Sequence, residues 1–137
     1  MKFDLSIATD IRTIRKSKGK AVAVIEAMTE RGYICRRYEA DHISGTNEAE
    51  LKALQIGAEH IIPKKGSSIT IHSNSEYVRS GLYSLKKWKQ NNWIRENGRE
   101  VANSDMWKEI EEHLEGNSYQ AVSLDQSKRE QILGGRE

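Results

Sequence analysis

The sequence predicts a mixed α/β protein, with a five-stranded mixed sheet flanked by helices. Three observations support this prediction. Apolar and polar residues alternate near the N-terminus, which is typical of strands. From about residue 50 the apolar spacing becomes helical, and short apolar strands then alternate with the helices. The 137 residues contain no repeat and no linker, so we expect a single domain over residues 1–137.

The first part of the chain predicts a meander of three strands. Phe3, Leu5 and Ile7 alternate with polar or small residues, which indicates a half-buried first strand. A loop is expected over residues 16–20, which contain a glycine. The three expected strands cover residues 3–10, 21–28 and 33–39.

The remainder alternates helices with two further strands. Apolar residues on one face of 51–61 predict the first helix, which we expect Pro63 to close. The polar group at 103–105 is expected to start the helix that carries Trp107. The other expected elements are strands over residues 69–73 and 119–124, and helices over residues 78–88 and 125–133.

The composition indicates a globular, well-solvated protein, because 36% of the residues are apolar and 31% are charged. No apolar run reaches the ~18 residues that a membrane span needs, and the first residues lack the apolar core of a signal peptide. We therefore expect no membrane partner. The single Cys35 fits a reducing, cytoplasmic compartment, and we expect it to be a core residue and not a nucleophile.

The net charge of +2 is too small to indicate nucleic acid by itself, but the charge is unevenly distributed. Two segments concentrate basic residues: residues 86–99 and residues 12–20. Their basic residues are Lys86, Lys87, Lys89, Arg95 and Arg99, and Arg12, Arg15, Lys16, Lys18 and Lys20. Such runs are either solvated faces or nucleic-acid-binding surfaces, and both interpretations remain open.

Residues 88–93, which read Trp-Lys-Gln-Asn-Asn-Trp, and four other segments of the chain resemble motifs of type 1 ribonuclease H. Residues 73–78 read Ser-Asn-Ser-Glu-Tyr-Val, similar to the family's Thr-Asp-Ser-Gln-Tyr-Val, and residues 46–51 are similar to its Thr-Asn-Asn-x-x-Glu-Leu. Residues 8–10 read Ala-Thr-Asp, like its Thr-Asp-Gly-Ser opening. Residues 88–93 resemble its basic Trp-Lys-Lys-Arg-Gly-Trp, and residues 101–107 its Val-Lys-Asn-Val-Asp-Leu-Trp.

This resemblance implies a ribonuclease H-like fold and a monomeric endonuclease that cleaves the RNA strand of RNA–DNA hybrids with two Mg²⁺ ions, or Mn²⁺. It implies that Asp10, Glu50 and Asn74 are catalytic metal ligands, converging from different elements as a phosphodiesterase site requires. Glu130 and Asp125 are the nearest candidates for the family's fourth acid. The residues implied to bind nucleic acid are Thr46, Asn47, Ser75, Tyr77, Lys86, Lys87, Lys89, Trp93 and Asn103.

The chain departs from the family pattern most clearly at Asn74, where the family has an Asp. An amide oxygen can coordinate a cation but carries no full charge, which weakens the attraction by several kcal/mol per ion. We therefore expect cleavage to be slower by a factor of about 10²–10⁴. Ile11-Arg12 replaces the family's Gly-Ser, and its His-containing loop before the last helix is absent.

The site residues also have purely structural interpretations. Asp10 could be an exposed turn residue, Glu50 could cap its own helix, and Asn74 could be a helix N-cap. Trp107 is expected in the core, whereas Trp93 is expected to pack on a nucleic-acid backbone.

Two other functions remain open from the sequence. The first is a catalytically inactive module of the same fold that binds hybrids or double-stranded RNA. The second is another nuclease of this fold, of resolvase or integrase type, which the basic tryptophan segment at residues 88–93 argues against.

Overall fold

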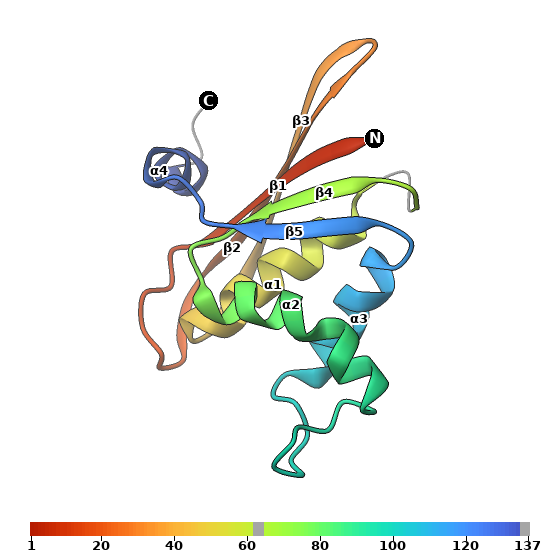
Figure 1. Cartoon of the computed structure of the whole chain (residues 1–137). Coiled ribbons are helices and arrows are strands. Elements are labelled where there is room, and N and C mark those ends of the chain that lie inside the picture. The colour runs from red at the N-terminus through yellow and green to blue at the C-terminus, as the bar shows by residue number, and fades with distance from the viewer. Residues whose placement is uncertain (62–64, 135–137) are drawn as a thin grey trace.

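The computed structural model describes residues 1–61 and 65–134, in which five strands form one sheet and four helices lie against it (Figure 1). The helix-closing role expected of Pro63 falls outside the described residues. The elements are β1 (Lys2–Thr9), β2 (Ser17–Thr29), β3 (Gly32–Ser44), α1 (Thr46–Glu59), β4 (Ser68–His72), α2 (Glu76–Gln90), α3 (Ser104–Leu114), β5 (Ser118–Val122) and α4 (Gln126–Gly134).

The sheet is mixed, with the strand order β3-β2-β1-β4-β5. The pairs β1–β2 and β2–β3 are antiparallel, whereas β1–β4 and β4–β5 are parallel. This arrangement confirms the predicted α/β class and the mixed five-stranded sheet. It also places β1 at the centre, so the C-terminal end of β1 lies between elements from both halves of the chain.

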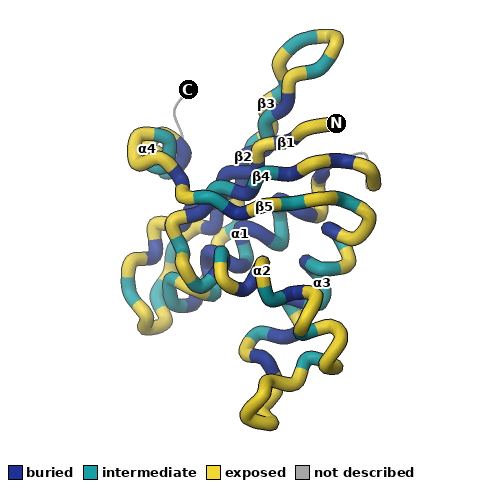
Figure 2. The backbone as a smooth tube through the Cα atoms, viewed as in Figure 1, coloured by how far each residue is buried: buried dark blue, intermediate teal, exposed yellow. Residues whose placement is uncertain are grey.

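Helices cover both faces of the sheet (Figure 1). Side chains alternate along a strand, so Leu5 and Ile7 of β1 join the large core with α1, α2 and α3, whereas Ala8 joins a smaller core with Ile132 of α4. From Leu5 to Thr9 β1 is buried on both faces, which corrects the prediction of a half-buried strand (Figure 2).

The two hairpin strands are longer than the apolar pattern predicted. Their pairing runs from Ser17 opposite Ser44 to Thr29 opposite Gly32, so most of the expected loop at residues 16–20 belongs to β2. Backbone hydrogen bonds continue the strands through polar residues that periodicity does not mark. Cys35 lies exposed on the edge strand β3, so its predicted core position is wrong.

Helices α2 and α3 meet at Trp107, which is fully buried as expected. Its ring lies edge-on to Trp88, with the centroids 5.6 Å apart. Gly81 of α2 faces the same ring, and a Cβ there would lie 2.3 Å from Trp107 Cζ2. The close approach of α2 to α3 therefore depends on a glycine at this position.

No helix in the described part of the chain is both long enough and apolar enough to cross a bilayer.

We expect Gly81→Ala to lower the free energy of unfolding by about 1–2 kcal/mol net, because the overlap of the new methyl group with the Trp107 ring costs about 2–3 kcal/mol. This loss outweighs the gain of about 1 kcal/mol from the higher helix propensity of alanine. Urea unfolding measures the change, with Ser80→Ala, an exposed neighbour on α2, as the matched control. A Gly81→Ala protein as stable as the unmodified one would contradict this packing.

Candidate active site and nucleic-acid interface

Three segments meet at the C-terminal end of β1. The Glu50 carboxyl group on α1 accepts a hydrogen bond from Ser73 Oγ at 3.0 Å, and the backbone of Thr9 hydrogen-bonds the same group. Thr9 precedes Asp10, and Ser73 precedes Asn74. The structure therefore brings together the segments that carry the three predicted metal ligands.

The first turn of α1 is fastened to the loop that follows β1. Thr46 Oγ1 donates to Ile11 O at 2.8 Å and to Thr13 O at 3.1 Å, and the Thr46 N–H also donates to Thr13 O. The N-cap residue Gly45 makes no side-chain cap, and Glu50 points to Ser73, so the predicted capping role of Glu50 is wrong. The Thr46 hydroxyl bonds the backbone here, and its predicted contact with nucleic acid stays a prediction.

Glu50 is an unusually buried carboxyl group, with 4% of the residue exposed. Loss of water on burial raises the pKa of Glu50 to about 7, although the Ser73 hydrogen bond, the positive charge of Arg129 and the Thr9 backbone favour the carboxylate. Near neutral pH the protonated and the ionised form of Glu50 are therefore both populated, and a bound cation would favour the ionised form.

Asp10 is exposed just beyond β1, and its Oδ1 accepts the Lys20 N–H at 2.8 Å. Gly19 makes this approach possible, because a Cβ there would lie 2.4 Å from Asp10 Oδ1. The position agrees with the turn interpretation of Asp10 and also leaves the carboxylate accessible to a ligand.

Asn74 joins the β4–α2 junction to the end of β5. Its Oδ1 accepts the Leu124 N–H at 3.0 Å, whereas Ser75 caps α2 by accepting the Val78 N–H at 3.2 Å. The predicted N-cap role of Asn74 is therefore wrong, because Ser75 performs it.

Helix α4 contributes a residue that the sequence did not single out. Arg129 Nη2 donates to Thr9 O at 3.1 Å, which places a positive charge near Glu50. Glu130 is exposed and accepts from Gln126 at 3.4 Å, and Asp125 accepts the Lys128 N–H in the first turn of α4. The sequence of α4 has no clear apolar stripe, so it did not predict which of its side chains face the sheet. In the structure Arg129, and not Glu130, faces the end of β1.

The donor set fits a divalent cation held by few charges. Asp10 and Glu50 offer carboxylates and Asn74 a neutral amide oxygen, and oxygen donors of this kind suit Mg²⁺ or Mn²⁺. Within residues 1–61 and 65–134, however, these residues are not part of any group of three acidic, His or Cys side chains with ligand atoms within 4.8 Å of one another. With Asn74 uncharged and Arg129 adjacent, the site attracts cations less than three carboxylates would.

Beside Asp10, a cavity of about 680 Å³ extends along the start of β2 and the end of β3. Lys18 and Lys20 line it, and so does His42, whose Nε2 lies 3.2 Å from Glu48 Oε2. Lys18 and Lys20 belong to a basic cluster that is evident in the sequence, whereas His42 was not indicated, because the third strand was expected to end at residue 39.

A second group of predicted binding residues lies at the start of α2 and α3. Asn103 Nδ2 donates to the Tyr77 hydroxyl at 2.9 Å, and Trp107 Nε1 donates to it at 3.4 Å. Asn103 has a left-handed backbone (φ 57°), which asparagine tolerates well. Asn103 and Tyr77 are thus in contact, and Ser75 lies two residues before Tyr77 at the start of α2. Asn47, the other predicted binding residue with an amide side chain, is exposed in the first turn of α1.

The segment between α2 and α3 extends away from the sheet (Figure 1). Trp93 is partly buried against the core, 6.4 Å between centroids from Trp88, so its contact with nucleic acid stays a prediction. Lys87 pairs with Glu96 at 3.1 Å. Lys89 pairs with Glu111 at 3.1 Å, which raises the pKa of Lys89. These acids offset part of the positive charge that the sequence concentrates here.

Comparison with known proteins identifies the family. The sequence model of the RNase H family matches residues 4–124. Ribonuclease H of Treponema denticola is 32% identical over an alignment of 91 residues, and the match covers 57% of this chain and 57% of the relative. Ribonuclease HI of Haemophilus ducreyi is 33% identical over 70 residues, which are 50% of this chain and 44% of the relative. The chain belongs to the RNase H family.

The predicted relationship to type 1 ribonuclease H is thereby confirmed, although the alignments span only about half the length of these curated relatives. The RNase H family generally depends on divalent metal ions.

Solved structures agree with the fold. LC9-RNase H1, described as a type 1 RNase H with the type 2 active-site motif, superposes with a TM-score of 0.70 at 16% identity, covering 100% of this chain and 75% of that one. The foamy viral protease-reverse transcriptase, solved with an RNA/DNA hybrid, gives a TM-score of 0.70 at 12% identity over 98% of this chain and 19% of that one. These likenesses support the ribonuclease H-like fold.

The raised pKa of Glu50 predicts a specific pH dependence of stability. Because the folded state holds this proton up to about pH 7 and the unfolded chain only to about 4.5, stability contributed by the protonated group is full below pH 4.5 and is lost as the pH rises to about 7. One pKa unit corresponds to about 1.4 kcal/mol, so the free energy of unfolding falls by about 3 kcal/mol between pH 4.5 and about 7.

Urea unfolding in EDTA should therefore show the unmodified chain losing stability relative to Glu50→Gln between about pH 4.5 and 7. The difference between the two proteins removes the contribution of the other titrating groups. A constant difference across this range would show that Glu50 keeps an ordinary pKa.

Proposed function

We propose that this chain is a ribonuclease H-type endonuclease that hydrolyses the RNA strand of RNA–DNA hybrids, and that Asn74 makes its turnover slow. The observation that carries the proposal is the meeting of Thr9, Glu50 and Ser73 at the end of β1, in a chain of the RNase H family. This contact supports Asp10, Glu50 and Asn74 as neighbours in one site.

In this proposal Asp10, Glu50 and Asn74 hold Mg²⁺ or Mn²⁺, with Glu130 as the candidate fourth acid. Divalent ions bound there would neutralise charge on the phosphate and generate a nucleophilic hydroxide from water. Ser73 and the Thr9 backbone orient the Glu50 carboxyl group, and the Leu124 N–H fixes the Asn74 amide oxygen. Arg129 lies close enough to Glu50 to favour its ionised form.

The hybrid would lie across the basic surfaces on either side of this site. The RNA strand is distinguished by its 2′-hydroxyl groups, and the DNA strand is held through its phosphates. In this proposal Ser75, which donates its N–H to Ser73, and the hydrogen-bonded pair Tyr77 and Asn103 bind the hybrid beside the site. Lys86, Lys87, Lys89 and Trp93 would extend this surface along α2 and the segment after it. Thr46 and Asn47 complete it at the start of α1. We further propose that the protein acts as a monomer in the cytoplasm.

A catalytically inactive module that binds hybrids or double-stranded RNA is the second candidate. Two observations favour it: residue 74 is a neutral Asn, and the guanidinium of Arg129 lies by Glu50 and adds positive charge where a cation would bind. Such a module binds its ligand in a salt-dependent way and does not cleave it.

Asn74→Asp is expected to increase hybrid cleavage with Mg²⁺ or Mn²⁺ by a factor of about 10²–10⁴, because it restores a charged ligand. The substitution isolates the charge, since an Asp oxygen can still accept the Leu124 N–H. A gel assay with a labelled RNA strand measures the rate, and Asn74→Ala serves as the control that removes both charge and oxygen.

Adding Glu50→Gln to the Asn74→Asp protein should abolish the gained activity. If the Asn74→Asp protein binds hybrids tightly but cleaves no faster than the unmodified chain, the metal-site assignment is wrong and the binding module is favoured.

Lys86→Gln is expected to weaken hybrid binding and to reduce the slope of log K against log salt by about 0.9, because one phosphate contact is lost. Lys86 is exposed on α2, and Lys2→Gln on β1 is the matched control because Lys2 is an exposed lysine away from the proposed surface. Fluorescence anisotropy at several salt concentrations gives both slopes. Equal slopes for the two variants would place the hybrid elsewhere.

A further inference from the structure

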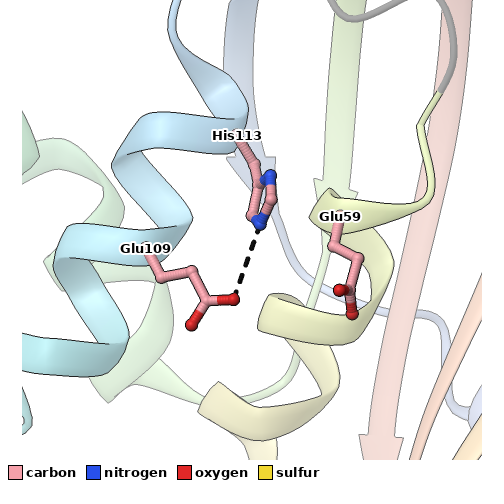
Figure 3. Close-up of side chains that lie close together, drawn as sticks. All are labelled: Glu59, Glu109 and His113. Carbon is pink, nitrogen blue, oxygen red and sulfur yellow. Dashed lines mark ion pairs between the residues drawn. The ribbon is translucent and has the colours of Figure 1, made fainter.

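A second group of potential metal ligands lies where the C-terminal end of α1 meets α3. Glu59 projects from the last turn of α1, and Glu109 and His113 project from α3 toward it (Figure 3). One ligand atom from each residue lies within 4.8 Å of the other two. Glu109 and His113 are four residues apart on one helix, a spacing that places both side chains on the same face.

The geometry is close to that of a coordinated ion. His113 Nε2 lies 3.6 Å from Glu109 Oε1. Two ligands on a tetrahedral ion with bonds of about 2.0–2.1 Å lie about 3.3–3.4 Å apart. The helical pair therefore needs only a small side-chain adjustment to chelate an ion, and the Glu59 carboxylate lies within 4.8 Å of both.

His113 Nε2 provides an independent indication of a ligand. This nitrogen is inaccessible to solvent, although 26% of the His113 side chain is exposed. Within the described part of the chain it makes an ion pair with Glu109 and no hydrogen bond. A buried polar atom without a partner costs about 1–3 kcal/mol, so native structures rarely leave one unsatisfied. The nitrogen faces the Glu109 carboxylate at a distance too long for a hydrogen bond and suitable for a shared ion.

A further contact orients the cluster from outside. The Gln55 side-chain amide donates to Glu109 Oε2, which leaves Oε1 on the side of His113. Lys52 in turn donates to Gln55 Oε1 at 3.4 Å. Hydrogen bonds that fix the unused oxygen of a carboxylate are typical of the surroundings of metal ligands.

We propose that Glu59, Glu109 and His113 bind a divalent first-row transition metal, with Zn²⁺ as the best fit, and that the ion joins the end of α1 to α3. One imidazole and two carboxylates suit Zn²⁺ better than Mg²⁺ or Ca²⁺, which prefer oxygen ligands alone. Water completes the coordination. The ion balances two carboxylates and satisfies the buried nitrogen.

This site is separate from the one at the end of β1. Glu59 lies nine residues after Glu50 on α1, which corresponds to ~14 Å along the helix axis. The proposal therefore does not depend on the proposed nuclease function. A metal at this end would hold α1 against α3 while Glu50 is positioned at the other end.

Thermal unfolding of the metal-free chain, with Zn²⁺ or Mg²⁺ added, tests the proposal. All samples carry Asp10→Asn, so that the proposed catalytic site contributes little to metal binding. Zn²⁺ at 100-fold above its Kd should raise Tm by roughly 5–10 °C, whereas Mg²⁺ at the same concentration should not. His113→Gln and, separately, Glu109→Gln should each remove most of this shift.

Glu112→Gln is the matched control, because it also removes a carboxylate from α3 but Glu112 is not one of the three proposed ligands; its charge acts on Lys89. It should retain the Zn²⁺ shift. Crystals soaked in Zn²⁺ should show an anomalous peak between the three side chains, which also covers the case in which a variant fails to fold. An equal Tm shift in the Asp10→Asn protein with and without His113→Gln, or an anomalous peak elsewhere only, would overturn the proposal.

Discussion

The buried hydrogen bond between Ser73 and Glu50 is the constraint on which the arrangement of the predicted site depends. It joins α1 to the β4–α2 junction, and the Thr9 contact adds the end of β1 to the same group. A buried carboxyl group without such partners would be costly, so these contacts fix the direction of the side chain. Asp10 and Asn74 take their positions from the residues next to them, Thr9 and Ser73.

The proposed metal site carries little negative charge for a cation site. Asn74 is a neutral residue at a proposed metal-ligand position, and α4 adds Arg129 beside the Glu50 carboxyl group. Both features reduce the negative charge available to a cation, whereas the burial of Glu50 strengthens whatever attraction remains. The three segments therefore still meet at the end of β1, but the site offers less negative charge to a cation.

Helix α1 carries a residue of each of the two proposed metal sites. It packs against the central strands and α3, and it carries Glu50 near its start and Glu59 at its end. Its first turn is held by the Thr46 bonds to the loop after β1, and its last turn lies beside Glu109 and His113. The same helix thus carries one residue of each proposed site, Glu50 and Glu59.

The sequence by itself determined the α/β class, the order of the elements and the family, because periodicity and local motifs such as residues 88–93 are encoded by neighbouring residues. It also indicated Asp10, Glu50 and Asn74. Only the tertiary structure decided that β2 begins at Ser17, that Cys35 is exposed, that Ser75 caps α2, and that Arg129 and His113 face carboxyl groups. Those outcomes depend on strand pairing and on which face of a helix meets a distant segment, and such contacts leave no local pattern in the chain.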